Sequence, residues 1–213
     1  MGIYDLTHVM HSEMPVYPGK GQPVIGTAAS IEKDGYREMR LEIDGHTGTH
    51  IDAPAHMLPN GKMLNDYPVS KFTGKAVIIP VVLTISIIEI VHLQEYKTEI
   101  RHSDYVLFNT GWSKYWGTEN YRKDFPVLSE QAAKWLTAFQ LKGIGLDAIS
   151  VDPVESTTFE VHHILFQSDM VIVENMVFPV NLPSGKGVLY CFPLRFGNAD
   201  GSPVRAVMEY FEV

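Results

Sequence analysis

The chain has 213 residues, of which 45% are hydrophobic and 20% charged, a composition typical of a folded globular protein and not of a disordered one. Its formal net charge of −8 at pH 7 excludes nucleic acid and an anionic membrane surface as favoured partners, because their phosphates would repel it. The start, MGIYDLTHVM, lacks the pattern of a signal peptide, and no stretch approaches the roughly 20 apolar residues of a membrane-spanning helix.

Several segments carry the patterns of β-strands. In REMRLEID, residues 37–44, the apolar residues Met39, Leu41 and Ile43 alternate with polar ones and so share one face. The short apolar runs typical of buried strands are KAVIIPVV (75–82), YVLFNT (105–110), MVIVENMV (170–177) and VLYCFPL (188–194).

Cys191, the only cysteine, lies in the last of these apolar runs and is expected to be buried. Because no disulfide can form within the chain, we expect a cytoplasmic location.

One helix is predicted after Ser129, which can cap it. Apolar residues then recur at helical spacing from Ala132 to Phe139, and Gly143 is expected to end the helix. A second, short helix is predicted around residues 160–166.

The chain shows no internal division. The segment 84–101 fits a helix and a strand equally well, and we find no repeat, low-complexity tract or long linker. Many strands with few helices predict a mixed α/β fold, with residues 1–213 forming a single domain.

Histidines and an aspartate cluster in the segment HTGTHIDAPAH, at His46, His50, Asp52 and His56. Imidazole nitrogens and a carboxylate suit zinc, manganese or iron. The glycine and proline of this segment disfavour a helix, and in an extended chain all four side chains would share one face. A straight strand would hold His46 and His50 roughly 13 Å apart, so the chain is expected to bend at Gly48. We therefore expect His46, His50 and Asp52 to be metal ligands, with His56 nearby but uncoordinated.

A second group of candidate ligands lies far downstream. Glu174 interrupts an otherwise apolar strand, where an ionised carboxylate needs a metal ion or an arginine such as Arg195 or Arg205. His162 and His163 precede it on the predicted short helix. Together the two segments offer enough donors for two metal ions, with the aspartate of the first segment able to bridge them.

Motifs along most of the chain point to one known family. HTGTHIDAPAH is similar to the pattern H-x-G-T/A-H-x-D-x-P-x-H, and YDLTH, MPVYPG, HHILFQSDMVIVEN and FPLRFGNADGSPVRA resemble further segments of the same family. That family is the cyclase-type metal-dependent hydrolases, which include bacterial kynurenine formamidase and isatin hydrolase. The combination is specific to the family but not to one substrate.

The resemblance implies a swivelling β/β/α fold with a barrel-like mixed sheet, commonly assembled as a homodimer or homotetramer. It also implies a divalent metal, zinc or manganese, with one or two ions per subunit. The ligands that it implies by motif position are His46, His50, Asp52, His162 and Glu174.

Individual roles follow from the same resemblance. Asp52 would bridge two ions, and the family's downstream histidine stands twelve positions before Glu174, which selects His162 over His163. His56 corresponds to the family's catalytic histidine. Tyr17 takes the place of a tryptophan that lines the substrate pocket of the formamidase.

The expected activity is hydrolysis of an amide in a small molecule, such as an aryl formamide, a cyclic amide, or a related imide or lactone. The metal would polarise the carbonyl and acidify water, while His56 relays a proton to the leaving nitrogen. The alternative is a metal-dependent small-molecule binding protein without turnover, which would not require a free histidine there. A structural zinc module is disfavoured, because an acidic bridging ligand set suits an open catalytic site.

Other signals are set aside. Residues 143–148, GIGLDA, mimic a dinucleotide-binding fingerprint, but a helix precedes them and strand-like residues follow, the reverse of the required order. The roles of Asp147 and Asp152 stay open between polar groups near the site and ordinary strand ends. The histidines outside both segments are expected to be surface or core-edge groups, namely His8, His11, His92 and His102.

Overall fold

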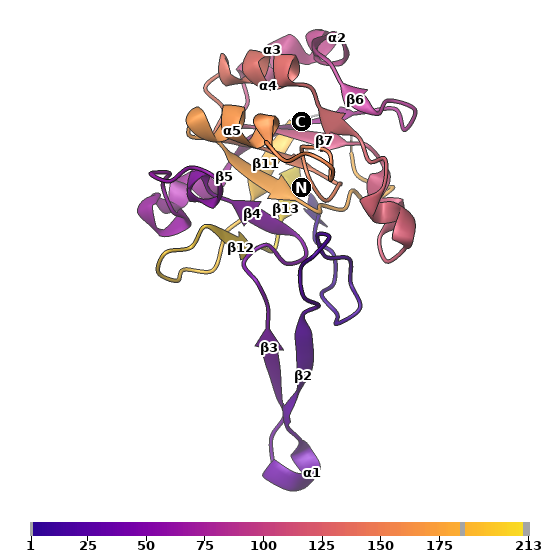
Figure 1. The fold of residues 1–213 in the computed structure, drawn as a ribbon, viewed down its shortest axis with the longest axis vertical. Coiled ribbons are helices and arrows are strands. Elements are labelled where there is room, and N and C mark those ends of the chain that lie inside the picture. The colour runs from indigo at the N-terminus through magenta and orange to yellow at the C-terminus, as the bar shows by residue number, and fades with distance from the viewer. Residues whose placement is uncertain (1, 184–185, 211–213) are drawn as a thin grey trace.

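One large mixed sheet organises the chain in the computed structural model, which describes residues 2–183 and 186–210 (Figure 1). Its nine strands run in the order β1-β13-β11-β5-β7-β9-β10-β4-β12. The central strands from β5 to β10 are parallel, and the strands on either side pair antiparallel. The strand bounds are Gly2–Asp5 (β1), His50–Asp52 (β4), Thr73–Pro80 (β5), Tyr105–Asn109 (β7), Gly143–Leu146 (β9), Val171–Glu174 (β10), Lys186–Tyr190 (β11), Gly201–Pro203 (β12) and Val207–Tyr210 (β13).

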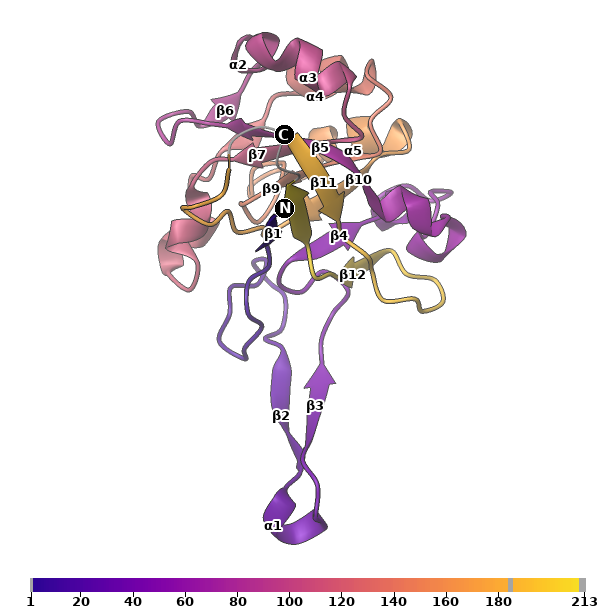
Figure 2. The same ribbon diagram turned by 180° about the vertical axis from the view of Figure 1, so that it is seen from behind.

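The sheet curls strongly, and short helices gather over one of its faces, as the two opposite views show (Figures 1 and 2). This arrangement confirms the predicted α/β class with a barrel-like mixed sheet. The α-helices are Ile31–Asp34 (α1), Ile90–Leu93 (α2), Lys97–Arg101 (α3), Glu130–Thr137 (α4) and Glu160–Gln167 (α5). Two small sheets join β2 (Val24–Ala29) to β3 (Glu38–Glu42) and β6 (Ile87–Ile88) to β8 (Val127–Leu128). Single 3-10 turns lie at Pro54–His56, Leu64–Asp66, Val69–Phe72, Gln94–Tyr96, Trp112–Tyr115 and Glu119–Arg122.

Alternation along the strands divides the buried side chains between the two faces of the sheet. In β10, Ile172 packs into the cluster that contains the α4 and α5 side chains, whereas Val171 and Val173 pack into the cluster on the other face. Side chains two residues apart share a face, so Glu174 points to the same side as Ile172. The helix-covered face is therefore the one that carries the site described below.

The predicted buried strands are confirmed. The four apolar runs form β5, β7, β10 and β11, and Cys191 is fully buried just after β11. The two predicted helices are also confirmed as α4 and α5. Ser129 caps α4, since its hydroxyl oxygen accepts a hydrogen bond from the backbone N–H of Ala132 at 3.1 Å.

The predicted role of Gly143 is wrong. Helix α4 ends at Thr137, and Gly143 begins β9 between two neighbouring strands. An added Cβ at this position would overlap the backbone oxygen of Val171. Glycine is therefore needed for close strand packing and not to end a helix. The ambiguous segment 84–101 contains both structures, since β6 is followed by α2 and α3.

The strand predicted in residues 37–44 exists as β3, but its apolar face lies outside the core. It pairs with β2 alone, and both Met39 and Leu41 are exposed. The β2–β3 hairpin projects from the body of the molecule with α1 at its tip (Figures 1 and 2).

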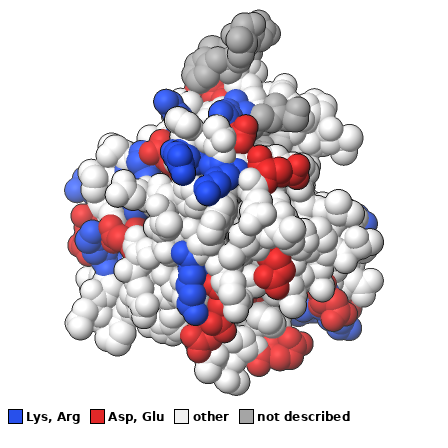
Figure 3. Space-filling view, turned by 90° about the horizontal axis from the view of Figure 1, so that it is seen from above, with Lys and Arg blue, Asp and Glu red and all other residues white. Residues whose placement is uncertain are grey.

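Two features of the surface bear on the expected partners. Within residues 2–183 and 186–210, no helix is long and apolar enough to cross a membrane. On the face drawn in Figure 3, acidic and basic side chains lie in small mixed groups separated by uncharged surface.

The close packing of β9 gives the first testable prediction. We expect Gly143→Ala to lower the free energy of unfolding by about 1–3 kcal/mol, because the new methyl group meets backbone that cannot rotate away. Gly26→Ala is the matched control, since a Cβ there meets nothing within 4 Å, and its effect should stay within about 0.5 kcal/mol. Urea unfolding of both variants measures the difference, and equal stabilities would contradict the packing argument.

Candidate metal centre

Strand β4 places two of the predicted ligands on the helix-covered face of the sheet. His50 pairs with Glu174 across β4 and β10, and His50 and Asp52 share a face because they are two residues apart. Gly48 has a φ of +66°, which confirms the predicted bend. The bend returns His46 to the same place, where its Nδ1 lies 2.6 Å from Asp52 Oδ1.

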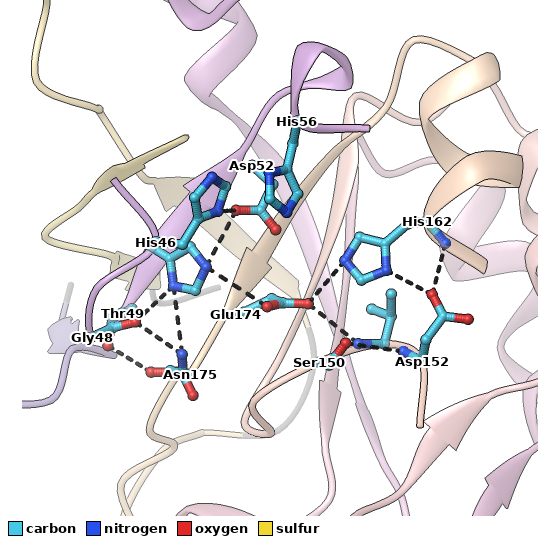
Figure 4. Close-up of polar contacts among 12 residues, drawn as sticks. His46, Gly48, Thr49, Asp52, His56, Ser150, Asp152, His162, Glu174 and Asn175 are labelled. Carbon is cyan, nitrogen blue, oxygen red and sulfur yellow. Dashed lines mark hydrogen bonds and ion pairs between the residues drawn. The ribbon is translucent and has the colours of Figure 1, made fainter. Parts of the chain in front are cut away.

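Two overlapping sets of donor atoms meet at Asp52. Within each set, the nitrogen and carboxylate oxygen atoms lie within 4.8 Å of one another, close enough to hold a metal ion. Glu174 lies between His162 on one side and the His46–Asp52 pair on the other (Figure 4). The structure thus brings together all five predicted ligands, and their binding of metal remains a prediction. The sets are His46, His50 and Asp52, and Asp52, His162 and Glu174.

The carboxylates at this centre need a cation. The side chains of Asp52 and Glu174 are almost completely buried, and in the described part of the chain their ion pairs are with histidines alone. Arg205, which sequence analysis offered as a partner of Glu174, pairs with Asp5 at the surface. Nitrogen and oxygen donors without a thiolate fit a divalent ion such as zinc or manganese.

Proton affinities at the centre reflect the same excess of negative charge. Burial opposes protonation of His46 and His162, yet neighbouring carboxylates raise the pKa of His46 to about 9 and that of His162 to about 10. Burial alone would raise the pKa of Asp52, but His50 and His46 hold that pKa well below its ordinary value. A divalent cation at this centre would compete with these protons, so metal binding should release them.

Asp152 orients His162. Its Oδ2 accepts a hydrogen bond from His162 Nδ1 at 2.6 Å, and its two oxygens accept the backbone N–H groups of Val161 and His162 at 3.0 Å. One carboxylate thus caps the start of α5 and fixes the ring, which leaves Nε2 facing Glu174 Oε1 at 3.4 Å. Sequence analysis left Asp152 open between a polar group near the site and an ordinary strand end, and the contact with His162 shows that it is a polar group near the site.

A buried chain of hydrogen bonds orients His50. Its Nδ1 donates to the carbonyl oxygen of Gly48 at 2.7 Å, and Asn175 Nδ2 donates to the same oxygen at 3.0 Å. The Tyr121 hydroxyl in turn donates to Asn175 Oδ1 at 2.9 Å. Sequence reasoning missed Asn175 and Tyr121; the only signal was the amide side chain directly after Glu174.

His56 lies beside these donor sets on the 3-10 turn that follows β4. Its ring centroid is 3.8 Å from that of His46, and its Nδ1 is 3.5 Å from Asp200 Oδ2. His46, His56 and Asp200 also have donor atoms within 4.8 Å of one another, but all three remain partly exposed. Sequence reasoning did not single out Asp200, although it lies in the motif FPLRFGNADGSPVRA.

A cavity of about 450 Å³ opens onto this centre. Tyr17, Met57 and Phe159 supply apolar wall, and the Tyr17 hydroxyl donates to the backbone oxygen of Val154 at 3.3 Å. His163 also lines the cavity, but among the described residues it belongs to none of the donor sets. Tyr17 therefore lies where a substrate-contacting residue was predicted.

The remaining candidates lie away from the donor sets. His8 stacks on Trp116, and His92 Nδ1 accepts the backbone N–H of Glu89. His11 and His102 likewise lie outside the donor sets found among the described residues. Asp147 is fully buried directly after β9, and its Oδ1 accepts hydrogen bonds from the backbone N–H and the hydroxyl of Thr110, directly after β7. It therefore joins the ends of these two neighbouring strands.

The curled sheet and the overlapping donor sets define an α/β protein that can hold divalent cations, and sequence comparison gives the family. Residues 4–153, more than half of the chain, match the family described as putative cyclase, so the chain belongs to it. Kynurenine formamidase of Bacillus cytotoxicus is 31% identical over 205 residues, which cover 96% of this chain and 95% of that protein. Kynurenine formamidase of Sphingopyxis alaskensis is 29% identical over 212 residues, 97% of each chain.

Solved structures share the fold. A protein described as a potential metal-dependent hydrolase with cyclase activity superposes with a TM-score of 0.83 at 28% identity, covering 97% of this chain and 96% of its own. Isatin hydrolase A from Labrenzia aggregata has a TM-score of 0.84 at 23% identity, with 97% and 93% covered, a likeness of fold alone.

Adjacent histidines on α5 give the second prediction. We expect His162→Ala to lose metal from the set with Glu174, because His162 Nε2 faces that carboxylate, and His163→Ala to keep it. Metal content of both purified variants, measured by mass spectrometry, tests this. Metal loss in the His163 variant alone would refute the assignment.

Proposed function

We propose that this chain, acting as one domain of residues 1–213, is a metal-dependent hydrolase of amide bonds in small molecules. The observation that carries the proposal is the pair of donor sets sharing Asp52 at a cavity, with an additional histidine, His56, beside them. Membership of the putative cyclase family and similarity to kynurenine formamidases support the reaction class.

The proposed metal ligands are His46, His50, Asp52, His162 and Glu174. When bound, zinc or manganese polarises a scissile carbonyl and lowers the pKa of water. One or two ions per subunit fit this proposal, because the two donor sets overlap at one carboxylate. Asp152 holds the His162 ring, and the Asn175 amide holds the loop that fixes His50.

His56 is the proposed proton relay. It would accept a proton from the attacking water and deliver it to the leaving nitrogen, so that the products are a carboxylic acid and an amine. Asp200 Oδ2 lies within 3.5 Å of His56 Nδ1 and can orient its ring. The apolar wall with Tyr17 suits a flat aromatic group, which favours aryl formamides and cyclic amides such as isatin.

Two further expectations belong to this proposal. The chain would work in the cytoplasm, in keeping with its single buried cysteine, and as a homodimer or homotetramer. The competing hypothesis is a metal-dependent binding protein without turnover. A panel of aryl formamides, cyclic imides and isatin distinguishes the two, because metal-loaded wild type that binds these amides and hydrolyses none would support the binding protein.

Metal removal gives the third prediction. Stripping the metal should abolish turnover and lower the melting temperature, because the buried carboxylates Asp52 and Glu174 then lose their cation. Restoring the ion at about 100 times its dissociation constant should stabilise the fold by about 2.7 kcal/mol. Calorimetry and rate measurements on the same samples test both effects, and full activity in rigorously metal-free protein would overturn the proposal.

The fourth prediction separates proton transfer from metal binding. His56→Ala should keep its metal and its melting temperature while turnover falls by about 10²–10⁴-fold. His102→Ala is the matched control, because this exposed histidine directly follows helix α3 and belongs to none of the donor sets found among the described residues; it should retain full turnover. If metal content fell together with activity in the His56 variant, His56 would be a ligand and not a relay.

A further inference from the structure

A third set of donor atoms lies on the solvent side of the proposed metal centre, and we call it the outer set. It consists of His46, His56 and Asp200, whose nitrogen and carboxylate oxygen atoms lie within 4.8 Å of one another. His56 and Asp200 belong to neither of the two sets that share Asp52. The function proposed above uses Asp200 only to orient His56, so the capacity of this set to bind an ion is unassigned.

Backbone contacts hold Asp200 beside β4, although it is distant from that strand in the sequence. Its carbonyl oxygen accepts the backbone N–H of Ala53 at 2.8 Å, and the next residue, Gly201, pairs with Asp52 across β12 and β4. A Cβ at Gly201 would lie 2.4 Å from the His46 ring, so glycine leaves the room that this ring occupies. The ring thus directs Nδ1 toward Asp52 and Nε2 toward Asp200.

The spacing of these donor atoms fits coordination of a metal ion. At bond lengths of about 2.0–2.1 Å, two ligands of a tetrahedral zinc ion lie about 3.3 Å apart. Asp200 Oδ2 lies 3.1 Å from His46 Nε2 and 3.5 Å from His56 Nδ1, so this oxygen already has the required spacing to both nitrogens. Two imidazoles and a carboxylate without a thiolate suit zinc or a similar divalent ion.

Solvent access separates the outer set from the main centre. The side chains of His56 and Asp200 are 28% and 49% exposed, whereas those of His50 and Asp52 are 4% and 1% exposed. An ion can therefore reach the outer set from solvent after the main centre is filled. His46 would offer Nε2 only when that nitrogen gives up its proton, because Nδ1 faces the main centre, so an ion in the outer set should bind more weakly than one in the main centre.

We propose that the outer set binds a further divalent ion, through His56 Nδ1, Asp200 Oδ2 and His46 Nε2, and that this ion inhibits turnover. The inhibition rests on the proposed role of His56 as proton relay, whereas the binding does not. With an ion on Nδ1, the proton of the neutral His56 ring lies on Nε2, so neither nitrogen has a lone pair to accept a proton from the attacking water. Metal in excess of the main centre would therefore stop the reaction that the main centre supports.

Calorimetric titration of zinc into protein with a loaded main centre tests the binding without any substrate. The wild type should show a binding event that Asp200→Asn and His56→Ala each weaken at least about tenfold. Asp44→Asn is the matched control, since this exposed carboxylate lines the same cavity but belongs to none of the donor sets found among the described residues, and it should change the affinity less than about threefold.

A variant of the main centre assigns the event. His162→Ala removes a main-centre ligand and should keep the event, because His162 is not part of the outer set. An event lost in His162→Ala but kept in Asp200→Asn would be the filling of the main centre and would refute the outer site. A wild type with no event, or equal affinities in Asp200→Asn and Asp44→Asn, would likewise overturn the proposal.

Turnover measured against free zinc tests the inhibition, with an amide that the substrate panel shows to be hydrolysed. The wild-type rate should rise as the main centre fills and fall as the outer set fills. Asp200→Asn should raise the inhibitory zinc concentration at least about tenfold, whatever its own maximal rate, and Asp44→Asn should not. A wild-type rate that stays maximal after the calorimetric event is complete would refute the inhibition. Absence of turnover on the whole panel would contradict the proposed function, whereas the titration would still decide whether the outer set binds an ion.

Discussion

The site depends on the free-energy cost of burying two carboxylates on one face of an apolar sheet. Asp52 and Glu174 lie on neighbouring strands β4 and β10, almost completely out of water. Burial of an ionised carboxylate without compensation costs several kcal/mol, and histidines are their only ion-pair partners among the described residues. A divalent cation held by these oxygens and the neighbouring histidines would offset this cost.

The rest of the site holds the nitrogen donors in place around these oxygens. Asp152 fixes His162 while it caps α5, so the helix start and the ring orientation depend on the same carboxylate. Asn175 acts in the same way on the turn at Gly48, whose carbonyl oxygen orients His50. These contacts tie Asp152, in the loop after β9, to the start of α5, and they tie Asn175, directly after β10, to the turn before β4.

The amino-acid sequence was sufficient to predict the buried strands, both main helices and all five donors that meet at the centre. Apolar runs and capping signals are local, so they predict elements without knowledge of their neighbours. The bend at Gly48 was also predictable, since His46 and His50 could not otherwise approach each other. The motif resemblance then selected His162 over its neighbour.

Only the tertiary structure decided what depends on contacts between distant segments. Gly143 looked like a helix end, but its role comes from the backbone of Val171 on the adjacent strand. Tyr121 reaches the site through the fold, and its local sequence carries no signal of this. Asp200 lies in a motif that resembles the family, but its approach to His56 depends on the packing of distant segments. In the same way, periodicity determined that Met39 and Leu41 share a face of β3. Whether that face is covered depends on where the hairpin points, because a local pattern fixes the side of a strand but not its surroundings.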